Sequence, residues 1–179
     1  MPSLLRTLTT LATTTAAIVG GLAISPKALA AQFGQQSIAP ESVIAVATPV
    51  RNGQLYLLTI LEQKPNQRQC WSESGSTPVV VDPLLLNFDF TGACERWTDS
   101  NGYSVRVNGE DLGVEYQLML SRRQNDLVLF ARSVRDRSAP PIEIGRTNGI
   151  TDGFLKIQLN AGWEMTRRTY NGQLLGHIY

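Results

Sequence analysis

Strict alternation of apolar and polar residues is the clearest pattern in the second half of the chain. Tyr103, Val105 and Val107 alternate with polar residues, and the same period of two recurs over residues 114–120 and 155–159. Such alternation places apolar side chains on one face of a pleated strand. Shorter apolar runs at residues 43–47, 55–61, 127–130 and 142–144 predict further strands. After residue 30 no stretch has the helical period of 3.6, so the pattern predicts an all-β domain.

Asn-Gly pairs lie beside most of these predicted strands. Asn52-Gly53 separates the runs at residues 43–47 and 55–61, and further pairs occupy residues 101–102, 108–109, 148–149 and 171–172. Asn and Gly tolerate the positive φ angles that tight hairpin turns require. Short strands joined by tight turns predict antiparallel pairing in a sandwich or a small barrel. The pattern does not choose between these two architectures.

The first thirty residues differ from everything that follows. Arg6 gives a positive start, residues 8–24 are apolar and threonine-rich without charge, and Ala28-Leu29-Ala30 has the form of a cleavage signal. The threonines dilute the apolar run below the ~20 strongly apolar residues of a membrane span. We therefore predict a signal peptide over residues 1–30 and export to the periplasm or the extracellular medium. No later segment has the length and apolarity of a membrane span.

Composition sets the size and class of the mature part. A chain of 179 residues with 42% hydrophobic and 17% charged residues is typical of one globular domain. Residues 31–41 are polar, with Gly and Pro, and we expect a flexible arm there, followed by a single all-β domain over residues 42–179. The formal net charge of +1 lacks the basic field of a nucleic-acid-binding protein, so nucleic acid is not an expected partner.

Cys70 and Cys94 are the two cysteines of the chain. In an oxidising compartment two cysteines of a small domain usually pair, which predicts one disulfide. With a single histidine and no C-x-x-C motif, one chain cannot supply a tetrahedral zinc site or a thioredoxin-like redox motif. We therefore predict no metal and no cofactor.

The segment over residues 70–103 concentrates the side chains that could carry chemistry. Paired carboxylates can hydrolyse glycans, and exposed aromatic rings can stack on sugars. The candidate binding residues are Trp71, Glu73, Asp82, Asp89, Trp97 and Asp99. Three of these carboxylates also have a structural explanation, because Asp82 precedes a proline, Asp89 alternates with Leu86, Phe88 and Phe90, and Asp99 begins a turn. Residues 99–102 also resemble part of a calcium loop, although its terminal Glu is missing.

Nucleophilic catalysis finds little support in the sequence. His177 is the single histidine and lies near the end of the chain, and neither G-x-S-x-G nor a glycine-rich phosphate loop is present. The leading hypothesis is a non-enzymatic binding or structural domain of the cell envelope or periplasm. Its partner would be an envelope polysaccharide or another envelope protein. The alternative is a small glycan hydrolase that uses the carboxylates of residues 70–103.

Several motifs together resemble a known family. They are CWSESG, VDPLLLNFDFTG with the second cysteine, DSNGYS, EIGRTNG, FLKI and the closing TRRTYNGQLLGHIY. The chain resembles the cyanobacterial secreted proteins grouped as domain of unknown function 3747, from about residue 33 to residue 179. This resemblance implies an exported cyanobacterial protein. It implies no activity, ligand or catalytic residue, because the family has none to transfer.

Overall fold

Antiparallel strands make up most of the molecule. The computed structural model describes residues 33–84 and 92–179, and these residues contain fourteen strands, one 3-10 turn (Pro40–Ser42) and no α-helix. The strands are β1 (Gly34–Ser37), β2 (Val43–Val50), β3 (Leu55–Gln63), β4 (Trp71–Ser74), β5 (Val80–Pro83), β6 (Cys94–Trp97), β7 (Arg106–Val107), β8 (Glu110–Asp111), β9 (Tyr116–Arg123), β10 (Asp126–Ser133), β11 (Ile142–Arg146), β12 (Phe154–Leu159), β13 (Thr166–Tyr170) and β14 (Gln173–Ile178). Every ladder between them is antiparallel, which confirms the all-β prediction.

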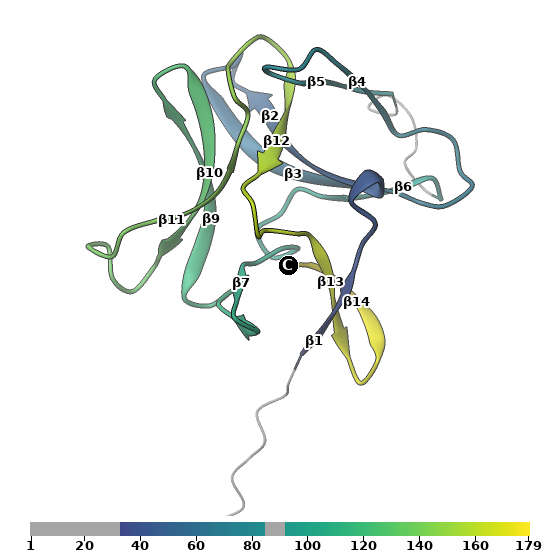
Figure 1. Ribbon diagram of the computed structural model, residues 1–179, viewed down its shortest axis with the longest axis vertical. Helices are drawn as coiled ribbons and strands as arrows, with labels where there is room; N and C mark the ends of the chain where they lie inside the picture. Colours follow the sequence, from purple (N-terminus) through teal and green to yellow (C-terminus); the bar gives the residue numbers. More distant parts are fainter. Residues whose placement is uncertain (1–32, 85–91) are drawn as a thin grey trace, which may run out of the picture. The chain divides into compact units, whose positions relative to one another are not determined.

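The largest sheet curls around the main hydrophobic core. Its strands follow the order β6-β3-β2-β12-β11-β10-β9, with β5 paired to β12 and β4 paired to β5 (Figure 1). The last strand of this path, β9, comes back close to β3. Buried residues of β2, β3, β10, β11 and β12 therefore meet in one cluster inside the curl. The architecture is an open, barrel-like sheet rather than two flat layers.

Strand β2 is buried on both of its faces. Val43, Ala45 and Ala47 belong to the cluster inside the curl, whereas Ile44 and Val46 belong to a second cluster on the other face. This second cluster is covered by β4, β5 and the disulfide. A strand covered on both faces has a continuous apolar run instead of an alternating one. This double burial explains the uninterrupted sequence VIAVA at residues 43–47.

Three of the five Asn-Gly pairs form the hairpin turns that the sequence predicts, whereas Asn101-Gly102 and Asn148-Gly149 lie in longer connections between strands. In the turns between β2 and β3, between β7 and β8 and between β13 and β14, the Asn and the Gly both have positive φ, for example 50° at Asn108 and 83° at Gly109. Asparagine and glycine adopt this conformation at low cost. The hairpin prediction is confirmed at these three positions.

Residues 34–37 form a strand in a segment that the sequence predicts to be a flexible arm. β1 pairs with β13 in the register Gly34↔Thr169 to Ser37↔Thr166. A Cβ atom at Gly34 would lie 2.6 Å from the Thr169 Oγ1, so the strands approach closely because residue 34 has no side chain. The expectation of a flexible arm is corrected here: backbone hydrogen bonds to an open strand edge do not require apolar side chains.

Residues 103–107 do not form the regular strand that their alternation predicts. Arg106 and Val107 alone form a ladder there, while Tyr103 makes an isolated parallel bridge with Ile178. The backbone N–H of Ser104 donates to the carbonyl of Ile178 (2.9 Å), and Ser104 is buried together with both of its neighbours. Residues 103–105 therefore run beside the C-terminal strand and are all buried. Their alternation does not separate a core face from a solvent face.

Arg167 joins the small sheet β1-β13-β14 to the main sheet. Its Nη2 lies 2.8 Å from a carboxylate oxygen of Glu62 on β3 and 3.2 Å from one of Glu95 on β6. The guanidinium also lies over the Trp97 ring, 5.3 Å from its centroid. The Trp97 Nε1 in turn donates to the carbonyl of Gly176 on β14 (3.1 Å). These contacts hold the C-terminal hairpin against the open end of the curl.

Within the described ranges, no helix is long and apolar enough to cross a bilayer.

Candidate functional site

A cavity of about 230 Å³ lies inside the curl of the main sheet. Apolar side chains from six consecutive strands of the pairing path line it. They are Leu58 and Ile60 of β3, Ala45 of β2, Leu159 of β12, Ile144 of β11, Leu129 of β10 and Leu118 of β9. Alternation within each strand directs these residues to the same side of the sheet. The curl thus produces a mainly apolar cavity that reaches the surface at the exposed residues Gly109, Gly162 and Glu164.

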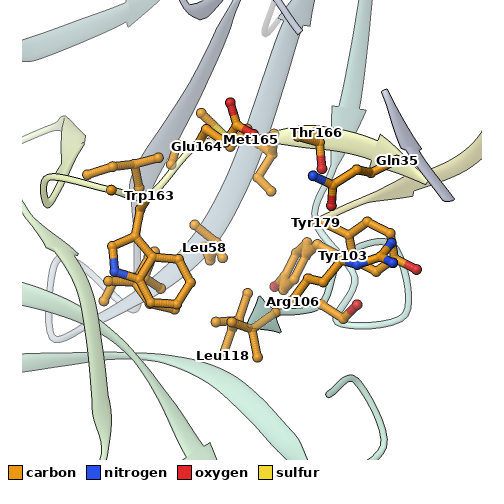
Figure 2. Close-up of a pocket in the computed structure, with 18 of the residues that line it drawn as sticks. Gln35, Leu58, Tyr103, Arg106, Leu118, Trp163, Glu164, Met165, Thr166 and Tyr179 are labelled. Atoms are coloured by element: carbon orange, nitrogen blue, oxygen red, sulfur yellow. The ribbon is translucent and has the colours of Figure 1, made fainter. Parts of the chain in front are cut away.

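The two ends of the cavity differ in chemistry. Figure 2 shows Trp163 at one end and Tyr103, Arg106, Tyr179 and Gln35 at the other, with Leu58 and Leu118 between them. Burial, followed by the charge of Asp99, raises the pKa of Tyr103 above its ordinary value, so its phenol stays protonated. The cavity therefore has an apolar end and an end with polar groups.

Arg106 is the cation at the polar end. Its Nε and Nη2 both donate to the carbonyl of Gly109 in the β7–β8 turn, at 2.9 and 2.7 Å. Its guanidinium lies over the Tyr179 ring, 5.1 Å from the centroid. The third nitrogen, Nη1, is buried and has no hydrogen-bond partner, and among the described residues it is the one buried side-chain nitrogen or oxygen in this state. Buried polar atoms are nearly always paired, so this nitrogen requires an explanation.

Asp111 organises a polar network behind Arg106. Its carboxylate accepts hydrogen bonds from the Gly113 backbone (2.9 Å), the Tyr179 hydroxyl (3.1 Å) and the Ser104 hydroxyl (3.2 Å), and it also contacts Arg168 Nη2. Burial by itself would raise the pKa of Asp111, but the Gly113 hydrogen bond, the charge of Arg168 and the two hydroxyl donors outweigh it and lower the pKa. Asp111 is thus a carboxylate that fixes the C-terminal residues around the cavity.

His177 and Ser104 form a hydrogen-bonded pair at the edge of this network. The imidazole Nδ1 lies 3.1 Å from the carbonyl of Asn101, which can only accept, so the Nδ1 carries the proton. Burial and then the positive charge of Arg168 lower the pKa of His177, which favours the neutral ring. Its Nε2 then accepts from Ser104 (2.8 Å) whenever Asp111 (3.2 Å) does not, because the serine hydroxyl has a single hydrogen to donate. Asp111 contacts the serine and not the imidazole, so these residues do not form the Ser-His-Asp relay of a hydrolase.

Trp71 and Glu73, two of the residues predicted from the sequence, lie together outside the cavity. The Trp71 Nε1 donates to Glu73 Oε1 (3.1 Å), and Glu73 pairs with Lys156 at 2.8 Å. Trp71 is 8% exposed and packs in the cluster beneath the disulfide. Neither residue lines the cavity. Their contacts are those of a packed ring and a paired surface charge.

The other predicted binding residues are dispersed. Asp82 is exposed on β5, opposite Ser72, and therefore points to the other face of the β4–β5 ribbon from Glu73. The Asp99 carboxylate accepts from the Asn101 backbone (3.0 Å) and caps a turn. Trp97 is 8% exposed and faces the main core. Asp89 lies outside the described residues. Within the described ranges no group of His, Cys, Asp and Glu side chains could hold a metal ion.

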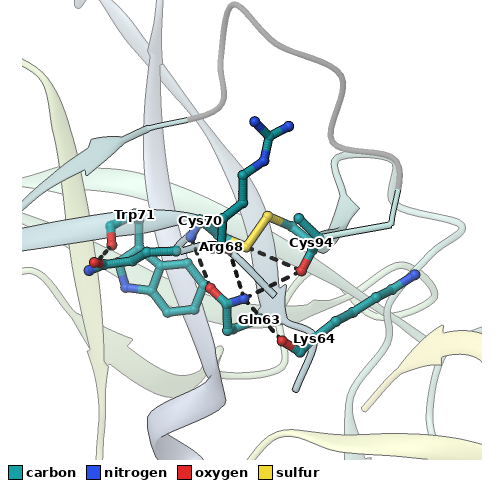
Figure 3. The surroundings of a disulfide bond; sticks show 8 residues. Gln63, Lys64, Arg68, Cys70, Trp71 and Cys94 are labelled. Atoms are coloured by element: carbon teal, nitrogen blue, oxygen red, sulfur yellow. Dashed lines mark hydrogen bonds between the residues drawn. A yellow bond between two sulfur atoms is a disulfide. The ribbon is translucent and has the colours of Figure 1, made fainter. Parts of the chain in front are cut away.

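Cys70 and Cys94 form the predicted disulfide, which joins the residue before β4 to the first residue of β6 with a Cα–Cα distance of 6.1 Å. Figure 3 shows that Gln63 links the surrounding backbone. Its Oε1 accepts from the N–H of Cys70 (2.9 Å), and its Nε2 donates to the carbonyl of Arg68 (3.1 Å). Both cysteines are buried in the second core cluster, so the bridge has a structural role.

A family model matches nearly the whole chain. The family is described as "Protein of unknown function (DUF3747)", and its model matches residues 8–179. The chain belongs to the DUF3747 family. This result confirms the family that the sequence motifs indicate, whereas the cyanobacterial origin and the export stay predictions. No curated protein and no solved structure matches the DUF3747 chain.

The sequence gives little sign of the cavity in this DUF3747 protein. Leu118 and Leu159 look like ordinary core positions of alternating strands, and Arg106 looks like their solvent-facing partner. The one available signal is the position of Arg106 directly before the Asn108-Gly109 turn, whose carbonyl at Gly109 holds its guanidinium. The convergence of these residues depends on the curl of the sheet.

Proposed function

We propose that this DUF3747 protein is an exported, non-enzymatic binding domain whose cavity holds a small, mainly apolar molecule. The observation that carries the proposal is the chamber of about 230 Å³ lined by apolar residues of six consecutive strands. Interiors of folded domains are close-packed, and voids larger than a water molecule are few. Mostly apolar concave sites with a few polar groups are the usual form of small-molecule sites.

The volume sets the size of the ligand. At about 30 Å³ for each water-sized group, a cavity of about 230 Å³ has room for about eight such groups. This corresponds to an aliphatic chain or a single aromatic ring with a short substituent. The polar end of the cavity would receive the head of such a molecule. A polysaccharide is a poorer match, because Trp71 and Trp97 are buried instead of forming an exposed stacking platform.

Export is supported by two independent features. Residues 1–30 have the pattern of a cleavable signal peptide. The buried Cys70–Cys94 bridge is typical of proteins that fold in an oxidising compartment. We therefore propose the periplasm or the extracellular medium as the location of the domain. The alternative of a glycan hydrolase needs two carboxylates that face one substrate, and Glu73 and Asp82 point to opposite faces of their ribbon.

Ligand-observed NMR on the mature protein tests the cavity. We expect octan-1-ol and octanoate to show saturation transfer from the protein. Leu118→Trp, which places a large ring in the chamber, should abolish the signal for both probes. Leu57→Trp is the matched control, because Leu57 is exposed on the same sheet and does not line the cavity. Absence of binding by both probes to the wild-type protein, or undiminished binding by Leu118→Trp, would refute the proposed function.

A further inference from the structure

We infer that Arg106 makes this cavity a carboxylate-selective site: the apolar body of the ligand lies within the curl and its carboxylate binds the buried Nη1 of Arg106. This inference rests on the proposed function and names the class of ligand. It starts from the one buried side-chain nitrogen that lacks a hydrogen-bond partner among the described residues. That nitrogen belongs to a residue that lines the cavity.

The guanidinium of Arg106 is held in one orientation before any ligand arrives. Two of its nitrogens share the Gly109 carbonyl, and its plane lies over the Tyr179 ring. Tyr179 is itself fixed, because its hydroxyl donates to Asp111 and accepts from Arg168 Nε (2.6 Å). A fixed donor loses little entropy when a ligand binds. The Nη1 carries two N–H groups, which suit the oxygens of a carboxylate.

The charge around Arg106 favours an anionic partner. Its two hydrogen bonds are to a neutral carbonyl, and no ion pair in the described parts of the chain includes it. The nearby Asp111 is already paired with Arg168. Glu164 lines the same cavity, but it is exposed at the surface, where water screens its charge. The Nη1 atom is buried although Arg106 as a whole is half-buried, and a ligand carboxylate would supply the acceptor that its N–H groups lack.

The arrangement of the cavity matches a molecule with one charged end. Arg106 and Gln35 lie at the end opposite Trp163, so the cation and the indole ring are at opposite ends of the cavity, with apolar side chains between them (Figure 2). A short-chain or medium-chain fatty acid, or an aromatic acid of similar size, has this distribution of charge. A neutral alcohol would fill the apolar part without satisfying the cation. An amine would place a second positive charge beside Arg106.

Calorimetric titration with three probes of equal chain length tests the inference. Octanoate, octan-1-ol and octylamine are titrated into the wild-type protein, Arg106→Met and Arg137→Met. Arg137 is an exposed loop arginine that does not line the cavity, so its variant controls for the loss of one positive charge. A hydrogen bond to a charged group predicts that Arg106→Met loses about tenfold or more in octanoate affinity, with octan-1-ol affinity changed less than about threefold. Arg137→Met should bind octanoate as the wild type does.

The outcomes separate this inference from the proposed function. Octanoate and octan-1-ol binding the wild type equally, or an Arg106→Met variant that keeps its octanoate affinity, would overturn carboxylate selectivity and leave the cavity as an apolar binding site. Binding of none of the three probes would overturn the proposed function itself. Circular dichroism checks that Arg106→Met is folded, and if it is not, the comparison of the three probes on the wild-type protein decides the question.

Discussion

The Nε2 of His177 lies 2.8 Å from the Oγ of Ser104, which precedes it by 73 residues in the sequence. The contact joins β14, which contains His177, to Ser104, which lines the cavity. The imidazole is half-buried, and the charge of Arg168 faces it while that of Asp111 acts in the opposite direction. Protonation of this ring is therefore unfavourable in the folded protein.

The burial of His177 beside the positive charge of Arg168 predicts that stability falls as the pH drops below about 6.5. The pKa of His177 is lowered in the folded state, so below the unfolded value of 6.5 the unfolded chain binds a proton that the folded chain does not. The stabilisation is complete above pH 6.5 and is lost as the pH falls towards the folded pKa. Urea unfolding between pH 7.5 and 5 measures it. His177→Gln should show a smaller decline than the wild type over this range.

The pH window isolates the histidine. The pKa of Asp111 is lowered below its ordinary 3.8, so its titration lies beneath pH 5. Equal declines in the free energy of unfolding for the wild type and His177→Gln would mean that protonation of the imidazole does not destabilise the folded state.

Removing the Asp111 carboxylate should destabilise the domain by about 2 kcal/mol. Asp111→Ala leaves a half-buried Arg168 without its ion-pair partner and removes an acceptor from Ser104 and Tyr179. Glu110→Ala is the matched control, because Glu110 is the exposed preceding residue on β8. It should change the free energy of unfolding by less than about 0.5 kcal/mol. Thermal and urea denaturation measure both variants, and similar values for the two would contradict the assigned role of Asp111.

Gly145 on β11 is required by the close approach of β12. A Cβ atom there would lie 2.5 Å from the backbone oxygen of Gln158 and 3.0 Å from the Leu159 Cα. Because backbone atoms cannot rotate away, Gly145→Ala should cost about 2 kcal/mol through displacement of the strand. It should also weaken octanoate binding, since Ile144 and Leu159 line the cavity.

Gly176→Ala provides the contrasting substitution. A Cβ at Gly176 would have no atom within 4 Å, so its unfolding free energy should stay within about 0.5 kcal/mol of the wild type. Equal effects at Gly145 and Gly176 would show that a general cost of replacing glycine, and not the approach of β12, explains the loss.

The sequence by itself predicts the local structure of this protein well. The alternation over residues 155–159 gives β12, and Asn52-Gly53 gives the turn between β2 and β3. The pairing of Cys70 with Cys94 follows from there being two cysteines in a small domain. These features depend on neighbouring residues or on counting, so no knowledge of distant contacts is needed.

Local patterns mislead where a distant strand supplies the partner. GQQS at residues 34–37 is polar, yet it becomes β1 because β13 offers an open edge. Tyr103 and Val105 alternate with polar residues, yet their segment pairs with the C-terminal strand and Ser104 between them is buried as well. Residues 70–99 gather acidic and aromatic side chains in the sequence, but pleating sends Glu73 and Asp82 to opposite faces.

The tertiary structure alone decides the candidate site. Leu58, Leu118 and Arg106 meet because the main sheet curls until β9 lies near β3. The degree of curl is set by the strand order, by the packing of both core clusters and by the C-terminal hairpin held through Arg167. These are contacts between residues far apart in the chain. A period of two tells which side of a strand is apolar, but it does not tell whether the apolar sides meet as a packed core or leave a chamber between them.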